Sequence, residues 1–259
     1  MGDKEVLTRT ASMSSNSVSG GKKTGLLSTF RRALSMKSTP MGEHVDSFLD
    51  PEATPDQQKK ALYGIRLLVE KNKSSQEVIS TGAIPVLVLA LQEKKNTDFP
   101  LWSLWVLRFC AETSDTATGL ILQEPMMIES LIGLVNGAYV GSEQAKRSVE
   151  TMQHLSSHEM TLSLMGREDL FKCLTSALIA APPEATASLL TLINISEVNS
   201  GAVPSYLPQL ASDRTLTNLD RFAKAVPDKQ ELVDKLKAHL AKVAPAKEPA
   251  LKEEEEEGA

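Results

Sequence analysis

Apolar residues recur at helical spacing through most of the chain, from about residue 51 to residue 243. Four of these sets have apolar residues about three apart, which is the buried stripe of an amphipathic helix. Their equivalent positions, Leu62, Leu104, Val149 and Leu189, are 42, 45 and 40 residues apart. A period of about 40 residues is typical of helical-repeat arrays.

A second class of apolar segment lies between these four helices. These segments begin at Ile84-Pro85-Val86, at Pro125-Met126-Met127, near Asp169-Leu170-Phe171 and at Val203-Pro204-Ser205. Proline near the start of a helix costs little, because the first turn leaves its N–H groups unpaired. Two more stripes, at 216–226 and 232–240, predict two last helices separated by Pro227. The final helix suits the polar-faced cap that a repeat array needs at its end.

The two ends of the chain carry opposite charge. Residues 8–40 hold six Lys or Arg and no acid, and 13 of these 33 residues are Ser or Thr. Residues 244–259 hold two Lys against six Glu. Such segments bury too little apolar surface to fold alone. We therefore expect a disordered basic segment at 1–45, a helical domain at 46–243 and a disordered acidic segment at 244–259.

Composition narrows the class of protein. Aromatic residues make up only 4% of the chain, which favours an all-α fold, and the net charge of −5 gives no general reason to bind nucleic acid. Cys110 and Cys173 lie far apart inside apolar patterns, so we interpret them as buried thiols in a reduced compartment rather than as a disulfide. We see no secretory signal and no apolar run of the roughly 18 residues that a bilayer span needs.

One short stretch of the basic segment has apolar residues at helical spacing. Within Gly25 to Ser35, four apolar residues and two arginines can form a short amphipathic helix on contact with a partner or an anionic membrane. The residues are Leu26, Leu27, Phe30, Leu34, Arg31 and Arg32.

The same segment carries two candidate phosphorylation sites. Arg9 and Arg32 each lie three residues before a serine, Ser12 and Ser35 respectively, a spacing that basophilic kinases prefer. Phosphate on Ser35 would add negative charge beside Arg31 and Arg32 and weaken their attraction to an anionic surface. We therefore expect regulation through this segment.

The repeated units resemble armadillo repeats. Gly82-Ala83-Ile84-Pro85 and Gly201-Ala202-Val203-Pro204 are similar to the family's start motif, and residues 103–111 and 188–196 are similar to its third helix. The resemblance covers residues 57–243, most clearly in the first and last units. It implies a right-handed α-solenoid of about four armadillo-like repeats that acts as a protein-binding adaptor.

In this family, a Trp and an Asn four residues apart on the third helix hold an extended peptide. The Trp positions correspond here to Tyr63, Trp105, Glu150 and Leu190, and the Asn positions to Leu67, Phe109, His154 and Asn194. Trp105 and Asn194 match, but they belong to different units, and Leu67 and Phe109 offer no side-chain hydrogen bond to a peptide backbone. We therefore do not expect a clamp for basic localisation signals.

A different set of residues marks a candidate binding groove. Arg66 and Arg108 occupy equivalent positions on consecutive third helices, beside Tyr63 and Trp105. If they face the groove, cations next to aromatic rings suit an acidic or aromatic segment. The alternative interpretation is that both arginines are solvated on a helix face. With Asn194, these four residues are our candidates for partner contact.

Catalytic and metal-binding patterns are weak. His154 and His158 are four apart, but no third ligand accompanies them, so we interpret them as a helix-end or surface pair. Residues 20–24 resemble the end of a phosphate loop without the preceding strand and first glycine, and we expect no cofactor.

We expect a non-enzymatic cytoplasmic adaptor, with two alternatives left open. One is an armadillo-type nucleotide-exchange cochaperone of the 70-kDa chaperone, which has similar size and repeat number. The other is an organelle-targeted accessory subunit of an enzyme complex, because residues 8–40 have the composition of a transit peptide, although Asp3 and Glu5 argue against it.

Overall fold

The computed structural model describes residues 39–93, 95–137, 142–158, 165–197 and 207–242. The chain divides into two units, residues 1–37 and 38–259, and all described residues belong to the second. Within these ranges every regular element is a helix. The segments expected to be disordered, 1–45 and 244–259, lie almost wholly outside the described residues.

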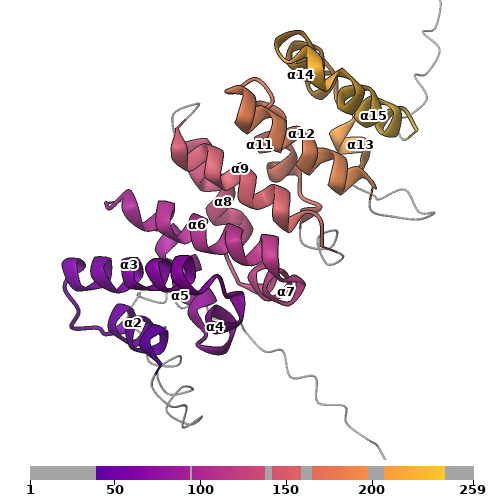
Figure 1. Cartoon of the computed structure of the whole chain (residues 1–259). Helices are drawn as coiled ribbons and strands as arrows, with labels where there is room; N and C mark the ends of the chain where they lie inside the picture. The colour runs from indigo at the N-terminus through magenta and orange to yellow at the C-terminus, as the bar shows by residue number, and fades with distance from the viewer. Residues whose placement is uncertain (1–38, 94, 138–141, 159–164, 198–206, 243–259) are drawn as a thin grey trace, which may run out of the picture. The chain divides into compact units, whose positions relative to one another are not determined.

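Five helices form one row in consecutive contact, which we call the third-helix row. Its members are α3 (Pro55–Asn72), α6 (Asp98–Thr113), α9 (Glu143–Leu155), α12 (Pro182–Glu197) and α15 (Gln230–Ala241). Figure 1 shows them following one another from indigo to yellow. Polar contacts join equivalent ends of neighbours: Lys59 meets Asp98 near the start of α3 and α6, and Asn194 meets Ser156 near the end of α12 and α9. Neighbouring helices of the row therefore run parallel.

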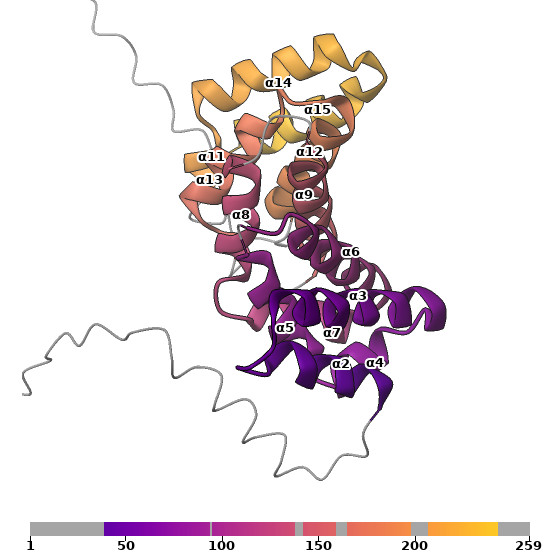
Figure 2. The same ribbon diagram turned by 90° about the vertical axis from the view of Figure 1, so that its left-hand side faces the viewer.

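A second row packs against the first. It consists of α2 (Pro40–Leu49), α5 (Ala83–Leu91), α8 (Met127–Gly137), α11 (Glu168–Ala177) and α14 (Asp213–Ala225), each in contact with the next. In Figure 2, α8 and α11 lie on the left and α9 and α12 on the right. Shorter helices connect the rows: α4 (Ser75–Ser80), α7 (Asp115–Gln123), α13 (Leu207–Leu210) and a 3₁₀ turn at Pro227–Lys229.

The predicted apolar stripes form the core between the rows. The four equivalent residues Leu62, Leu104, Val149 and Leu189 are all fully buried. Each lies on a helix of the third-helix row and packs into one continuous cluster. The 40-residue period therefore corresponds to one pair of packed helices per unit, which cannot bury its apolar faces without its neighbours.

The second-row helices begin close to where the sequence predicts. The predicted segments starting at Ile84, Pro125 and Asp169 correspond to α5, α8 and α11. Gly82, at the N-cap of α5, has a φ of 63°, a left-handed conformation that glycine adopts without steric cost. The fourth predicted start, at Val203, lies outside the described residues. The last two predicted helices correspond to α14 and α15, and the chain breaks between them at Pro227.

The domain boundary expected at residue 46 falls inside α2. Met41, Val45 and Phe48 are buried against the core, so the folded unit begins several residues earlier. These three residues have the spacing of one helix face, Thr39 caps the helix and Pro40 occupies its first turn. This stripe of three residues is short and directly follows a polar stretch, so the sequence pattern alone does not indicate a helix here.

No single helix among the described residues is long and apolar enough to cross a membrane. The bent pair formed by α7 and α8, with 82° between its halves, meets the criterion by length and composition only.

Candidate interaction surface

The first two helices of the third-helix row form a surface on which aromatic rings and cations alternate. We call it the α3/α6 surface and define it by six residues: Lys59, Tyr63, Arg66 and Lys73 from α3 and its C-cap, and Trp102 and Trp105 from α6. Within each helix these residues are three, four or seven apart, so they share one helix face.

The start of α3 is fixed by a capping box. The backbone N–H of Gln57 donates to Thr54 Oγ1 at 3.3 Å, and the backbone N–H of Thr54 donates to Gln57 Oε1 at 2.7 Å. The helix ends at Asn72, and its C-cap Lys73 has a left-handed φ of 50°. These two ends define the register in which α3 presents its side chains to α6.

The aromatic rings of this surface form two groups. The Tyr63 and Trp102 ring centroids are 5.0 Å apart with planes tilted by 49°. The Trp105 ring stacks on Phe109 at 6.0 Å with an interplanar angle of 5°. Tyr63 is 42% exposed, whereas the two tryptophans are half-buried. Rigid rings in partial contact with solvent are typical of sites that bind other proteins.

A cation lies over each tryptophan ring. Lys59 Nζ is 5.8 Å from the Trp102 ring centroid, while Arg66 Cζ and Lys73 Nζ are 5.7 Å and 6.0 Å from that of Trp105. At these distances the ring quadrupole attracts the cation, by about 0.5–1 kcal/mol at exposed sites. Throughout the described part of the chain, the cation–ring contacts all belong to α3 and α6.

The three cations differ in how far they are neutralised. Lys59 forms an ion pair with Asp98 at 2.6 Å. Arg66 reaches Glu70 only at 3.9 Å. Lys73 is exposed and has no ion-pair partner among the described residues. The C-terminal half of the α3/α6 surface therefore keeps uncompensated positive charge.

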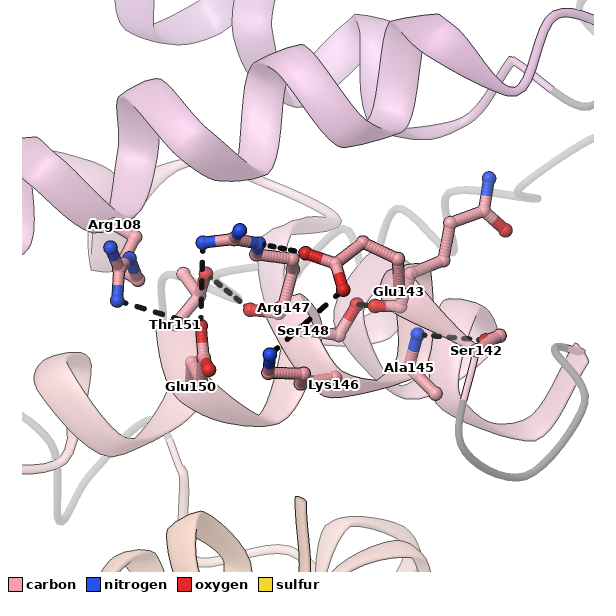
Figure 3. A network of polar contacts seen from close by, with 10 residues as sticks. Arg108, Ser142, Glu143, Ala145, Lys146, Arg147, Ser148, Glu150 and Thr151 are labelled. Atoms are coloured by element: carbon pink, nitrogen blue, oxygen red, sulfur yellow. Dashed lines mark hydrogen bonds and ion pairs between the residues drawn. The ribbon is translucent and has the colours of Figure 1, made fainter. Parts of the chain in front are cut away.

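Arg108 has a different environment from Arg66. Its Nη1 lies 3.5 Å from Oε2 of Glu150 on α9. Arg147 Nη1 forms a second ion pair with the same Glu150 oxygen at 3.7 Å, and Arg147 Nε pairs with Glu143 Oε1 at 2.6 Å. Figure 3 shows this network, with Arg108 pointing from α6 toward α9. Arg108 thus joins two units, while its sequence equivalent Arg66 lies over an aromatic ring.

One property is common to the two arginines. The Nε atoms of Arg66 and Arg108 are both buried and have no hydrogen-bond partner within the described ranges. A buried N–H without a partner is unfavourable, so the aromatic and ionic contacts of the two guanidinium groups offset this cost.

Asn194 lies two helices away from the α3/α6 surface. Its Nδ2 donates to the buried Ser156 Oγ at 3.0 Å, and this bond joins α12 to α9. Farther along the row, Ser196 Oγ and His239 Nδ1 are 3.0 Å apart. The structure therefore brings Tyr63, Arg66 and Trp105 together, and places Asn194 at a separate junction.

Sequence reasoning missed Trp102, Lys59 and Lys73. Trp102 is three residues from Trp105, so the two indoles share a face of α6 by helical spacing alone. The family pattern assigns one Trp to each third helix, and in α6 that position is Trp105, so the pattern does not point to Trp102. Lys59 and Lys73 continue the stripe of Tyr63 and Arg66, and could have been found in the same way.

The N-terminal candidates lie outside the described residues. They are Ser12 and Ser35 for phosphorylation, and Leu27, Phe30, Arg31, Arg32 and Leu34 for membrane or partner contact. Their roles stay predictions.

Other titratable groups show how burial acts in this fold. Burial raises the pKa of both Cys110 and Cys173 to about 12, so the two thiols stay protonated at neutral pH. Burial also lowers the pKa of His154; Arg108 acts in the same direction, while Glu112 and Glu150 oppose the shift. No group of three or more His, Cys, Asp or Glu in the described ranges is arranged to hold a metal ion.

Solved structures show which fold this is. A designed armadillo repeat protein superimposes with a TM-score of 0.62 and 15% identity, over 86% of this chain and 87% of its own. Two engineered proteins superimpose with TM-scores of 0.64 and 0.56 at 13% and 14% identity, the first over 87% of each chain, the second over 79% of this chain and 100% of its own. No family model matches the sequence, and no curated protein matches it either.

At this level of identity the likeness shows the fold alone. The chain is a right-handed α-solenoid of armadillo-like helical repeats, as its sequence predicts.

Proposed function

We propose that this protein is a non-enzymatic adaptor that binds an acidic protein segment on the α3/α6 surface. One observation carries the proposal: Arg66 and Lys73 lie over the half-buried ring of Trp105, and Lys73 has no acidic partner in the described part of the chain. An incoming carboxylate can pair with these cations while an apolar or aromatic side chain beside it packs on the rings.

The charge of α3 favours an acidic partner over a basic one. This helix and its C-cap carry five cations against two acids, Asp56 and Glu70, in a chain whose net charge is −5. The cations are Lys59, Lys60, Arg66, Lys71 and Lys73. In contrast, α12 carries no Lys or Arg. Positive charge in the third-helix row is therefore concentrated where the aromatic rings are.

The expected affinity is modest and depends on salt. Exposed ion pairs contribute about 0.2–1 kcal/mol each, and charges of this kind influence the association rate and the choice of partner more than the total affinity. Since the Debye length falls from about 10 Å at 0.1 M salt to about 3 Å at 1 M, binding to this surface should weaken steeply over that range.

Tryptophan fluorescence tests the proposal directly, because both tryptophans of the chain belong to the α3/α6 surface. We expect a peptide of alternating Glu and Phe to change the emission with saturation, and a peptide with Lys in place of Glu to leave it unchanged. Lys73→Glu should weaken binding of the acidic peptide about 3- to 10-fold, since it replaces an attractive pair with a repulsive one.

The control variant is Lys172→Glu on α11. It makes the same change in net charge at an exposed site whose ion pair with Glu168 is local to that helix. Equal weakening by both variants would mean that net charge alone governs binding, and would contradict a specific α3/α6 surface.

A further inference from the structure

Residues 253–257 are five consecutive glutamates, the most concentrated charge in the sequence. We propose that this acidic segment docks on the α3/α6 surface of its own chain and competes there with the acidic partner. The inference rests on the proposed function, because it assigns an internal competitor to the same surface.

Charge complementarity points to α3, which with its C-cap has the largest excess of Lys and Arg over Asp and Glu in the third-helix row, five against two. The segment follows α15, whose two lysines already have partners: Lys235 pairs with Glu197, and Lys237 with Asp220. Lys73 has no ion-pair partner among the described residues, and Arg66 has only a long contact with Glu70. On α15 only the C-cap Lys242 has no ion-pair partner among the described residues, so the C-terminal half of α3 offers the acidic segment the denser group of cations.

Because the helices of the third-helix row are parallel, the C-terminal ends of α15 and α3 lie on the same side of the row. Asn194 and Ser156 join the ends of α12 and α9, and Ser196 and His239 join the ends of α12 and α15. At the other end of the row, Lys59 of α3 meets Asp98 of α6 near the start of both helices. Because neighbouring helices run parallel, α15 ends on the side of the row where Arg66 and Lys73 lie.

The chain is long enough to make the connection. Packed helices lie about 8–10 Å apart, so the four steps from α15 to α3 span about 32–40 Å. Glu253 to Glu257 follow Lys242 by 11–15 residues, and an extended chain of that length reaches about 36–54 Å. The sequence between includes Pro245 and Pro249, residues that favour extended over helical backbone. A chain of this length is therefore sufficient to reach the cations of α3.

The competition should be weak and sensitive to salt. A short flexible connection gives an effective concentration of the order of millimolar, and a nearly extended one gives less. Since exposed ion pairs contribute little individually, we expect the segment to weaken binding of an external acidic peptide about 2- to 5-fold at low ionic strength, and hardly at all at 1 M salt.

A spin label detects the docking without any peptide. Because Cys110 and Cys173 are buried, a label attached to Ala259→Cys reports on the acidic segment alone. We expect the label to broaden the indole N–H signals of Trp102 and Trp105 at low salt. Because the docking is within one chain, the broadening should persist when labelled protein is diluted with unlabelled protein. The broadening should disappear when the five glutamates are changed by Glu253→Gln, Glu254→Gln, Glu255→Gln, Glu256→Gln and Glu257→Gln. Unbroadened indole signals at low salt would overturn the docking.

Peptide affinity then separates the two proposals. The five-glutamine variant should bind the acidic peptide about 2- to 5-fold more tightly than the full chain at low salt, with the difference lost at 1 M salt. Equal affinities for the two chains would overturn the docking and leave the proposed function standing. Broadened indole signals in a protein that binds no acidic peptide would support the docking and contradict the proposed function.

Discussion

At the scale of single residues, a close contact between α2 and α3 at the start of the fold depends on a glycine. A Cβ atom on Gly64 of α3 would lie 2.4 Å from Nε2 of His44 on α2. The ring of His44 would have to move away. Glycine therefore leaves room for the His44 ring, although glycine inside a helix is unfavourable by about 1 kcal/mol relative to alanine.

This contact leads to a prediction with a matched control. Gly133 in α8 has open space at its Cβ position, so Gly133→Ala should stabilise the protein by about 1 kcal/mol in urea unfolding. Gly64→Ala should be less favourable than Gly133→Ala by about 0.5–1.5 kcal/mol, because the His44 ring is displaced. In a His44→Ala background the two substitutions should become equivalent. Equal effects of the two substitutions with His44 present would contradict this packing.

His154 predicts a pH dependence of stability. Its pKa is lowered in the folded protein, chiefly by burial, so between that pKa and the unfolded value of about 6.5 the unfolded chain binds more protons. The contribution of neutral His154 to stability is therefore present above pH 6.5 and is lost as the pH falls through the folded pKa. Urea unfolding of the native protein should lose stability over this window faster than that of His154→Gln, and parallel curves would contradict the assignment.

At the scale of helices, the capping box of α3 should stabilise the element that carries half of the α3/α6 surface. Thr54→Ala removes the acceptor for the backbone N–H of Gln57 and should cost about 1 kcal/mol, measured by urea unfolding. Ser74→Ala is the matched control, because Ser74 is the N-cap of α4 but its side chain makes no capping hydrogen bond there. A loss at Ser74 as large as that at Thr54 would mean that the bonds seen at Thr54 contribute nothing specific.

The helices were predictable where their apolar stripes are long. The stripes around Leu62, Leu104, Val149 and Leu189 correspond to α3, α6, α9 and α12. Apolar residues at helical spacing share one face of a helix, and that face is the one buried in the core. The stripe of α2 is not evident from the sequence, since its three buried residues follow directly after a segment of polar composition.

The candidate site was predictable only in part. Helical spacing places Tyr63 and Arg66 on one face, but it cannot show which helix lies opposite. The same spacing gave Arg66 and Arg108 equivalent positions, yet their surroundings differ because Glu150 lies across from Arg108 and Trp105 lies across from Arg66. Contacts between residues about 40 apart depend on packing between units, which a single helix does not encode.

At the scale of the whole molecule, repetition lets one fold carry different surfaces along its length. Neighbouring helices of the third-helix row are joined in three different ways: by cation–ring contacts between α3 and α6, by ion pairs between α6 and α9, and by a hydrogen bond between α9 and α12. In a repeat array each unit contacts only its neighbours, so the surface of one junction can change while the others stay the same. Binding is therefore expected at one junction rather than along the full row.

The most direct test of that claim follows the backbone amide and indole N–H signals of isotope-labelled protein during titration with the acidic peptide. We expect the largest shifts at the Trp102 and Trp105 indoles and at the amides of α3 around Arg66 and Lys73, with α12 and α15 unchanged. Largest shifts on α12 or α15, with both indole signals unmoved at saturation, would contradict it.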